Sequence, residues 1–459
     1  MKSICFYFQI HQPFRLRTYR FFDIGNDHYY YDDFMNDDIV SCIAQRSYLP
    51  ANETIKEMIN TYGKKFKVAF SISGTALEQF EQFVPEFIDS MKELVATGCV
   101  EFLSETYAHS LSSLSDPEEF RQQVAAHDEK IQQLFGVTPK VFRNTELIYS
   151  DDIASMVYAM GFKGMIADGA KHILGWKSPN YLYSSVSAPK LKLLLKNSHF
   201  SDDISFRFSN SEWNEYPLTA DKFINWINGL PQEEQIVNLF MNYETLGELQ
   251  PRESGIFEFL KAIPRFAFEN DVNFITPSEA ISKLKPVAQL SVPTPMSWAD
   301  EARDTSAWLG NNLQNEAFHK LYSIAERVRL CEDRKLKQDW YYLQASDHFY
   351  YMCTKHFNDG SVHSHYSPYD TPFAAFTNYM NVLSDFIVRV EEQYPLSIEN
   401  EELNALLTTI RNQSQEISEL NKEVDMLRNN LIHEDKEEKE AAKPKAPAKK
   451  KPAAKKTDK

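Results

Sequence analysis

Cysteine and glycine are both scarce in this chain of 459 residues, which contains 5 Cys and 14 Gly. The cysteines are Cys5, Cys42, Cys99, Cys331 and Cys353. Their number is odd and no two of them have C-x-x-C spacing, so the sequence argues against a disulfide framework and against a zinc ribbon. Free cysteines at this low density favour a reducing compartment.

Long apolar runs are also missing. No segment approaches the ~18 consecutive apolar residues that a membrane-spanning helix needs. The apolar stretch at the N-terminus is short, lacks a small-residue cleavage site and leads directly into His11 and Gln12, which argues against a signal peptide. We therefore expect a cytoplasmic protein that does not use a membrane, with the N-terminal stretch forming a buried strand.

The net charge is −16, although the last residues of the chain are rich in Lys. An acidic body argues against a nucleic-acid groove on the main domain and is compatible with neutral substrates such as sugars. Aromatic residues are numerous, with 32 Phe, 23 Tyr and 6 Trp. They could fill a core or offer stacking platforms for sugars, and composition leaves both interpretations open.

Short apolar runs alternate with amphipathic stretches over about the first 280 residues. The runs predict buried strands at Ile4–Ile10, Lys67–Ile72, Val100–Leu103, Lys140–Phe142, Lys163–Ile166, Ile236–Met241 and Asn273–Ile275. The stretches between them predict helices at Ala51–Tyr62, Ala76–Thr97, Pro117–Phe135, Asp151–Met160 and Ala220–Asn228. Such alternation indicates parallel β/α units, and this number of units favours a closed or nearly closed barrel over residues 1–285. Catalytic groups of such barrels follow the strand ends.

The chain changes character after residue 285. The proline-containing segment Leu284–Pro295 resembles a linker, and the helical patterns after it predict an all-α domain over residues 286–395, packed on the barrel. A heptad repeat follows in residues 396–434. One seam position is occupied by Leu403, Ile410, Ile417, Val424 and Leu431, and the other by Leu406, Gln413, Leu420 and Leu427.

β-Branched residues at one seam position with Leu at the other favour a parallel two-stranded coiled coil, so we expect self-association through this segment. The alternative is an ordinary amphipathic helix lying on the body. Residues 435–459 are first acidic and then rich in Lys, Ala and Pro, a composition that predicts disorder. This tail could bind an acidic surface such as nucleic acid weakly, although such tails more often only improve solubility.

Polar clusters follow four of the predicted strands. His11 and Gln12 come after the first strand and can hydrogen-bond sugar hydroxyls. Glu105 and His109 lie beyond the third strand and are candidates to contact a ligand. Glu101 lies within that strand, where a carboxylate must be paired, so it is either a structural ion-pair partner or a support for the site.

Glu146 belongs to the strongest cluster, because it follows a strand and has Arg143 and Asn144 beside it. A neighbouring cation keeps a carboxylate ionised, which suits a nucleophile. The alternative is a surface Arg–Glu pair. A retaining glycosidase needs a second carboxyl about 5 Å from the nucleophile. The natural place for it is the end of a later strand, where Glu244 is the only carboxylate and stands two residues beyond Asn242.

Five stretches together resemble the signatures of glycoside hydrolase family 57, which contains α-amylases and glucanotransferases with an incomplete seven-fold β/α barrel. They are His11-Gln12-Pro13, Gly98–Glu101, Arg143–Leu147, Phe240–Gly247 and Thr276–Glu279. The stretches Ser297–Asp300 and Arg303–Asn311 are similar to the α-amylase branch of that family. The resemblance covers about residues 1–385. It implies an incomplete (β/α)7 TIM-like barrel followed by helices.

The resemblance also implies residue roles and a ligand. Glu146 matches the nucleophile, and Asn242 stands where the family has the Asp that acts as general acid and base. The implied substrate-binding residues are His11, Gln12, Glu105, His109, Trp298 and Asp300. The implied ligand is an α-glucan or maltooligosaccharide, with no metal and no organic cofactor. The clustered Asp and His that hold a metal in the related polysaccharide deacetylases have no counterpart in this sequence.

An amide cannot donate a proton at neutral pH, so Asn242 leaves three hypotheses open. The first is a retaining α-glucan hydrolase or transferase of the α-amylase type, impaired unless another carboxyl such as Glu244 substitutes. The second is a non-catalytic α-glucan-binding or regulatory protein built on the same barrel. The third is an assembly module that merely retains the barrel.

Overall fold

The computed structural model describes residues 2–299, 301–355 and 366–393, together with single residues and short stretches between 406 and 424. The chain divides into two compact units, Met1–Gln393 and Tyr394–Lys459. The first unit contains the predicted strands and the helical region. Whether the barrel and the helical region are separate domains that divide at residue 285 stays a prediction.

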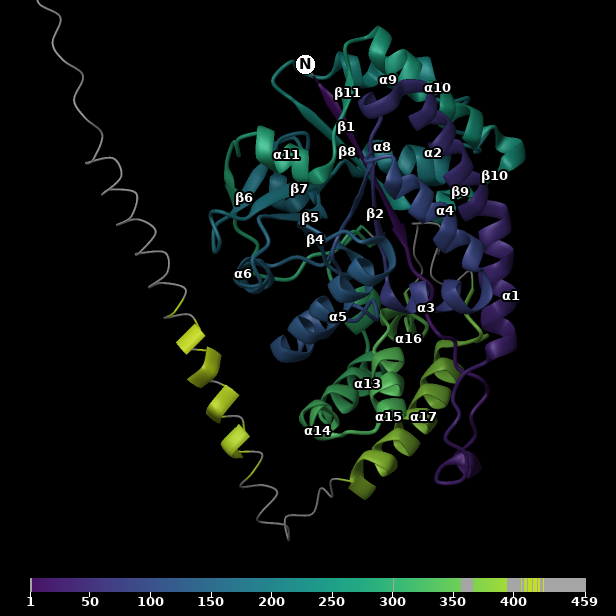
Figure 1. Ribbon diagram of the computed structural model, residues 1–459, viewed down its shortest axis with the longest axis vertical. Coiled ribbons are helices and arrows are strands. Elements are labelled where there is room, and N and C mark those ends of the chain that lie inside the picture. The colour runs from purple at the N-terminus through teal and green to yellow at the C-terminus, as the bar shows by residue number, and fades with distance from the viewer. Residues whose placement is uncertain are drawn as a thin grey trace, which may run out of the picture. The chain divides into compact units, whose positions relative to one another are not determined.

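Seven parallel strands form a ring at the centre of the first unit (Figure 1). They are β1 (Ser3–Ile10), β2 (Val68–Ile72), β3 (Val100–Phe102), β4 (Val141–Arg143), β5 (Gly164–Asp168), β7 (Lys192–Lys196) and β8 (Ile236–Asn242). Strands β8, β1, β2 and β3 pair in that order, and β4, β5 and β7 form a second run.

Short contacts close the two gaps between these runs. A parallel bridge joins Ser104 to Phe142, with the amide of Arg143 donating to the Ser104 carbonyl at 2.7 Å. On the other side the Asn197 amide donates to the Asn238 carbonyl at 2.9 Å. The two runs are therefore linked by a few isolated hydrogen bonds and not by continuous ladders, which agrees with the nearly closed barrel predicted from the sequence.

Three short strands lie outside the ring. Strand β6 (Tyr183–Ser185) pairs antiparallel with β7, β12 (Gln289–Leu290) pairs with β6, and β11 (Asn273–Phe274) pairs with the start of β1. A further pair, β9 (Leu246–Gly247) with β10 (Gln250–Pro251), follows β8. Because β12 falls within 284–295, the segment predicted as a linker contributes to a sheet.

The strands are buried on both faces, and the period of two decides which side chains face the ring interior. In β1, Ile4, Phe6 and Phe8 pack outward against the helices, whereas Cys5 and Tyr7 pack inside the ring. Gln9 therefore points inward at the carboxyl end of β1. The same alternation in β8 puts Leu239 and Met241 on the helix side and Phe240 inside. Asn242 shares the inward face of Phe240, which explains why its side chain reaches the mouth of the ring.

Helices cover the outside of the ring (Figure 1). Their bounds are α1 Asp33–Ile43, α2 Leu49–Tyr62, α3 Gly74–Phe83, α4 Pro85–Ala96, α5 Pro117–Phe135, α6 Asp151–Ala159, α7 Lys171–Leu174, α8 Ser198–Asp202, α9 Ala220–Gly229, α10 Ile256–Glu269 and α11 Pro277–Lys283. The single helix predicted over residues 76–97 is two helices, α3 and α4. Pro85 lacks an amide hydrogen, so it cannot continue a helix but is well suited to begin one.

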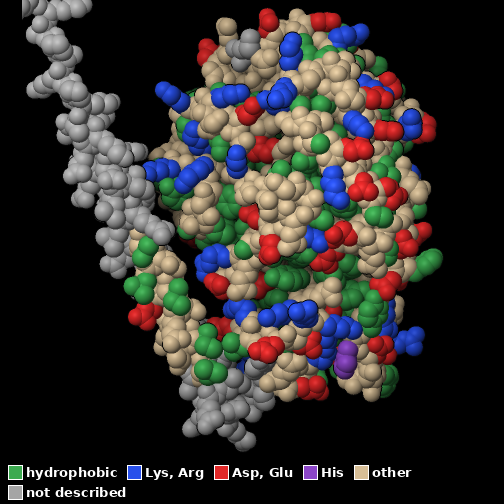
Figure 2. Space-filling view, viewed as in Figure 1, with side chains coloured by type: hydrophobic (Ala, Val, Ile, Leu, Met, Phe, Trp, Pro, Cys, Tyr) green, Lys and Arg blue, Asp and Glu red, His purple; other side chains and the backbone are tan. Residues whose placement is uncertain are grey.

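The helical region after residue 300 gathers at one end of the ring (Figure 1). It contains α12 Ser306–Leu309, α13 Asn312–Tyr322, α14 Ala325–Leu330, α15 Arg334–Leu343, α16 Ser346–Tyr350 and α17 Pro372–Gln393. On the surface of the described chain, acidic and basic side chains are interspersed over the face shown in Figure 2. No helix among the described residues is long and apolar enough to cross a membrane.

The described residues of the second unit are helical, and four of its apolar heptad residues are exposed. These are Leu406, Ile417, Leu420 and Val424, whereas Leu403, Leu427, Leu431 and the tail 435–459 lie outside the described residues. The parallel coiled coil, self-association through it and the disordered tail therefore stay predictions.

Candidate active site

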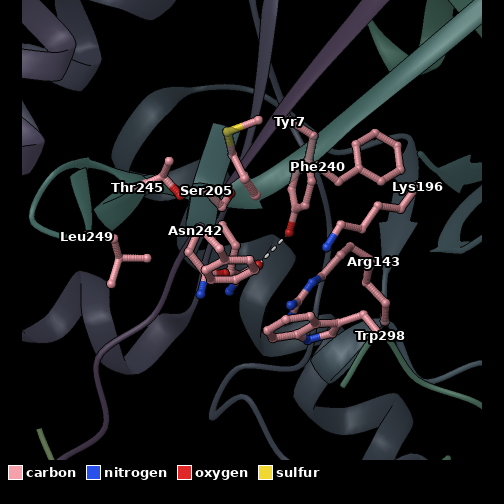
Figure 3. Close-up of a pocket in the computed structure, with 13 residues that line it drawn as sticks. Tyr7, Arg143, Lys196, Ser205, Phe240, Asn242, Thr245, Leu249 and Trp298 are labelled. Atoms are coloured by element: carbon pink, nitrogen blue, oxygen red, sulfur yellow. Dashed lines mark hydrogen bonds between the residues drawn. The ribbon is translucent and has the colours of Figure 1, made fainter. Parts of the chain in front are cut away.

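Two adjoining pockets open at the carboxyl ends of the ring strands. The first, here called the Glu146 pocket, is lined by His11, Gln12, His109, Glu146, Glu244 and Asp347, among others. The second, the Trp298 pocket, is lined by Tyr7, Lys196, Phe240 and Trp298, among others (Figure 3). Gln9, Arg143, Asn242 and Leu249 line both pockets, so the two form one continuous depression.

Glu146 occupies a strained turn directly after β4. Its φ angle is +53°, and that of Leu147 is +52°. A left-handed conformation costs a residue with a side chain about 1–3 kcal/mol and is found mainly at functional sites. The turn brings Glu146 back over the end of the strand, where it is 1% exposed and still lines the pocket.

Both carboxylate oxygens of Glu146 accept a hydrogen bond. His109 donates from Nε2 to Oε1 at 2.9 Å, and the indole Nε1 of Trp298 donates to Oε2 at 2.7 Å. Two donors on opposite oxygens fix the plane of the carboxylate and stabilise its negative charge. The side chain is therefore held as an oriented anion facing the pocket.

His109 is itself held by a buried acid. Its Nδ1 lies 3.0 Å from Oε2 of Glu105, which also accepts from the Ser71 hydroxyl at 2.5 Å through Oε1. Burial alone would raise the pKa of Glu105, but the hydrogen bond to His109 and the charge of Arg143 outweigh it and lower that pKa to about 2. Burial alone would lower the pKa of His109, but its two carboxylate partners raise it. The geometry is thus that of an imidazolium between two carboxylates.

His11 is neutral by contrast. Burial and the neighbouring charge of His109 lower its pKa to about 4, against the opposing effect of Asp347. Its Nε2 donates to Oδ2 of Asp347 in α16 at 2.8 Å, and its Nδ1 accepts from the Ser73 hydroxyl at 2.7 Å. The His11 ring stacks on that of His109 with 4.1 Å between centroids. The helical region thus fixes a ring at the mouth of the barrel.

Asn242 ends β8 and lies next to Gln9, its partner in the β1–β8 register. Gln9 is held by the Tyr7 hydroxyl, which donates to Oε1 at 2.5 Å. Figure 3 shows Asn242 across the pocket from Lys196. An amide here can donate and accept hydrogen bonds, but it cannot transfer a proton.

Glu244 follows Asn242 in the turn Tyr243–Thr245 and lines the Glu146 pocket. The Tyr48 hydroxyl donates to Oε1 of Glu244, and Gln12 Nε2 lies 3.5 Å from the same oxygen. Burial, together with the charge of Glu244, raises the pKa of Tyr48, so Tyr48 stays a donor. Glu244 is therefore a carboxylate at the pocket wall with its own supporting donors.

Trp298 is fixed by its backbone as well as by its ring. Its carbonyl accepts from Nη1 of Arg303, and its amide lies 3.4 Å from the Glu146 carbonyl. The Lys196 ammonium sits over the indole face, 4.8 Å from the ring centroid. These contacts hold the indole N–H on the carboxylate of Glu146 and leave the ring 8% exposed in the pocket wall.

The predicted site residues reach the site in different ways. His11, Gln12, His109, Glu146, Asn242 and Glu244 line the Glu146 pocket, Trp298 lines its neighbour, and Asp300 lies outside the described residues. Glu105 lies behind His109 and is fully buried, so we propose that it supports His109 instead of contacting a ligand. Glu101 accepts from the amide and hydroxyl of Ser278 at the start of α11, which is a structural pairing.

Sequence reasoning missed Tyr7, Gln9, Lys196 and Asp347 as parts of the site. The alternation of side chains along β1 would have identified Tyr7 and Gln9, because they share a face and Gln9 ends the strand. Lys196 ends β7, a strand that was not predicted. No local signal points to Asp347, which meets His11 across 336 positions of sequence. In the described ranges no group of three or more His, Cys, Asp or Glu side chains could hold a metal ion.

Comparison with known proteins finds similarity over most of the chain. A model described as "Glycosyl hydrolase family 57" matches residues 5–293. A protein of Methanocaldococcus jannaschii described as "Putative alpha-amylase" is 42% identical over 404 residues, which is 85% of each chain.

Solved structures share the fold at low sequence identity. A GH57-type branching enzyme of Thermococcus kodakaraensis is 13% identical with a TM-score of 0.61, covering 88% of this chain and 94% of its own. An alpha-amylase of Thermotoga maritima is 12% identical with a TM-score of 0.54, covering 88% and 96%. A 4-alpha-glucanotransferase of Thermococcus litoralis is 16% identical with a TM-score of 0.59, covering 76% of this chain, which spans only 56% of that enzyme's length.

Proposed function

Because this chain belongs to glycosyl hydrolase family 57, we propose that the Glu146 pocket binds α-glucans and that Glu146 is a retaining nucleophile whose acid/base partner is replaced by Asn242. The observation that supports this proposal is that Glu146 and Asn242 line one pocket. The oriented carboxylate of Glu146 suits attack on a sugar carbon. The amide at 242 suits binding of the glycosidic oxygen, but not its protonation.

The two steps of a retaining reaction depend on the acid/base group in different ways. In the first step the carboxylate oxygen of Glu146 bonds to the anomeric carbon, and the bond to the leaving oxygen breaks. A sugar leaving group needs a proton during that step. A phenolate leaves without one when the corresponding phenol has a low pKa. In the second step a base must take a proton from water, and Asn242 cannot do so. We therefore infer glucan binding with very slow cleavage.

An activated maltooligosaccharide aryl glycoside is the direct test of this proposal. We expect wild type to release about one aryl group per protein molecule in a burst, and then to turn over slowly because the glycosyl group stays on Glu146. Mass spectrometry of the intact protein and of its peptides measures the added mass and its position.

The Glu146→Gln variant is the control, since it keeps the shape of the site but has no carboxylate to attack. It should show neither burst nor added mass. Binding of maltoheptaose by calorimetry separates the remaining cases. Binding without any burst would reject Glu146 as a competent nucleophile, and absence of binding by wild type would reject the proposed ligand.

Trp298 is expected to position the nucleophile. In Trp298→Phe the aromatic face remains, but the hydrogen bond to Oε2 of Glu146 is lost. A hydrogen bond to a charged group is worth about 1.5–3 kcal/mol, so the rate of glycosylation by the aryl glycoside should fall about 10- to 100-fold. Rapid-mixing burst kinetics measure this rate, and maltoheptaose affinity should change less than about twofold. A loss of affinity with an unchanged rate would instead make Trp298 a sugar platform.

A second candidate is a working glycosidase in which Glu244 replaces the missing acid. The observation that favours it is that Glu244 also lines the Glu146 pocket, close to Asn242 in the chain. Two partners, Tyr48 and Gln12, already stabilise its carboxylate form, which opposes the protonation that an acid requires. We therefore rank this candidate second.

A further inference from the structure

An open groove lies beside the Trp298 pocket at the ends of β5 and β7. Residues lining this Trp176 groove include Asp168, His172, Asn197, Ser198, His199 and Arg303. It shares a wall with the Trp298 pocket: Asp168 is the register partner of Lys196, and Arg303 donates to the carbonyl of Trp298. The groove and the Trp298 pocket are therefore separated only by residues in direct contact with one another.

Trp176 lies in the chain segment beside the groove and is 92% exposed. It occupies the tip of a tight turn closed by hydrogen bonds from Gly175 to Lys171 at 2.8 Å and from Lys177 to Leu174 at 3.1 Å. Its two chain neighbours, Gly175 and Lys177, line the groove. An exposed indole on a turn held by hydrogen bonds offers a large flat apolar face and one polar N–H, a combination that is enriched at interfaces.

Asp168 supplies a polar partner on the floor of the groove. Its side chain is 1% exposed, and Oδ1 accepts from the Ser198 hydroxyl at 2.8 Å. Oδ2 has no hydrogen-bond partner in the part of the chain that the structure describes, and Nε of Arg303 is 3.9 Å away. An unsatisfied buried oxygen is unfavourable, and a hydroxyl group of a ligand would satisfy it.

The groove is also preformed. A Cβ atom at Gly169 would lie 2.4 Å from the carbonyl oxygen of Lys196, so the loop that starts the groove packs directly on the end of β7. The lining carries both signs of charge, with Lys171, Lys177 and Arg303 beside Asp168 and Glu301. Such a surface has no strong preference for an ionic ligand and suits a neutral polyol.

We propose that the Trp176 groove binds further glucose units of the α-glucan held in the Glu146 pocket, with Trp176 stacking on a sugar face and Asp168 accepting from a hydroxyl. The inference rests on the proposed function, because it extends the same ligand. It makes the protein selective for long chains, since only a long glucan reaches both positions at once. The second contact is then intramolecular and adds affinity through effective concentration.

Calorimetric titration with maltotriose and with maltoheptaose or longer chains tests this inference. For Trp176→Ala we expect affinity for the long chains to fall about tenfold, with affinity for maltotriose unchanged. Phe34→Ala is the matched control, because Phe34 is 84% exposed on α1 and does not line the groove. Trp176→Phe should restore part of the loss. Long chains should also protect the fluorescence of wild type from iodide quenching more than that of Trp176→Ala, because Trp298, Trp308 and Trp340 are buried and Trp213 and Trp226 are partly buried.

The outcomes separate the two proposals. Equal binding of long chains by wild type and Trp176→Ala, with no protection from iodide, overturns the groove inference and leaves the proposed function standing. Weaker binding of maltotriose and long chains alike by Trp176→Ala also overturns it, since the effect would then not depend on length. Failure of wild type to bind any of these glucans rejects the proposed function, and the groove inference with it.

Discussion

Replacing Asn242 by Asp is expected to raise the rate of starch hydrolysis by about 10²–10⁴-fold, which is what general acid catalysis contributes. The new carboxyl would stand at the inward-facing end of β8, in the pocket that Glu146 also lines. Asp and Asn have nearly the same shape, so the substitution changes the chemistry and leaves the packing alone. Reducing-sugar release from soluble starch measures the gain, and release of the aryl group from an activated glycoside should become continuous.

Two further variants make the result specific to acid/base chemistry. Asn242→Ala removes the amide without adding a carboxyl and should give no gain on starch. Asn242→Asp combined with Glu146→Gln should be inactive, because the acid has no nucleophile to assist. An Asn242→Asp protein that binds glucan as wild type does and still fails to cleave starch would contradict the assignment of position 242.

An active wild type would require another acid, and Glu244 is then the group to remove. In that case Glu244→Gln should abolish starch cleavage, whereas in the impaired protein it should leave an already low rate unchanged. The burst on the activated glycoside distinguishes the same two cases independently. A continuous steady state in wild type indicates a working base, and a single burst indicates that none is present.

Local sequence patterns predicted the ring strands except β7, but not the contacts between side chains that build the site. Strand β7 reads Lys-Leu-Leu-Leu-Lys, a short continuous apolar run that has no period of its own and escaped the prediction. The motifs placed Glu146, His109 and Asn242 at strand ends, and the structure puts all three on one pocket wall. Their shared location follows because the parallel strands of the barrel all end at the same side.

The remaining contacts depend on how distant segments dock. Trp298 was expected to bind substrate through the family resemblance, and its hydrogen bond to Glu146 could not be read from its sequence neighbours. The His11–Asp347 pair depends on the position of α16 against the ring mouth, which is set by packing between helices and not by a local motif. Sequence therefore predicts which residues reach the mouth of the barrel, and tertiary packing decides which of them pair.

His11 should make the folded protein sensitive to acid in a defined pH window. Its pKa is lowered from 6.5 to about 4 in the folded state, because the ring is buried and stacks on the charged ring of His109. A group with a lowered folded pKa contributes stability that is present above its unfolded pKa and is lost as pH falls toward the folded value. The difference of about 2.5 pKa units corresponds to about 3 kcal/mol, lost between pH 6.5 and 4.

The neighbouring groups titrate differently. The pKa of His109 is raised, so the stability that His109 contributes is lost as pH rises. The pKa of Glu105 is lowered to about 2, so the stability that Glu105 contributes is lost as pH falls below the ordinary carboxyl value near 4.5. His348 has a pKa lowered to about 4 by burial and shares the window of His11. Wild type should therefore lose stability between pH 7 and pH 4.5 through both His11 and His348.

His11→Gln isolates the share of His11, because an amide can still donate to Asp347 but cannot be protonated. Urea unfolding at pH 7 and at pH 4.5 measures both proteins, and the loss of unfolding free energy between these conditions should be about 2–3 kcal/mol smaller in the variant. His348→Gln should also shrink the loss, and the two effects should not simply add, because the charge of His11 contributes to the lowered pKa of His348. A His11→Gln protein that loses as much stability as wild type would show that the pKa of His11 is not lowered in the folded state, and that burial and stacking on His109 do not disfavour its protonation.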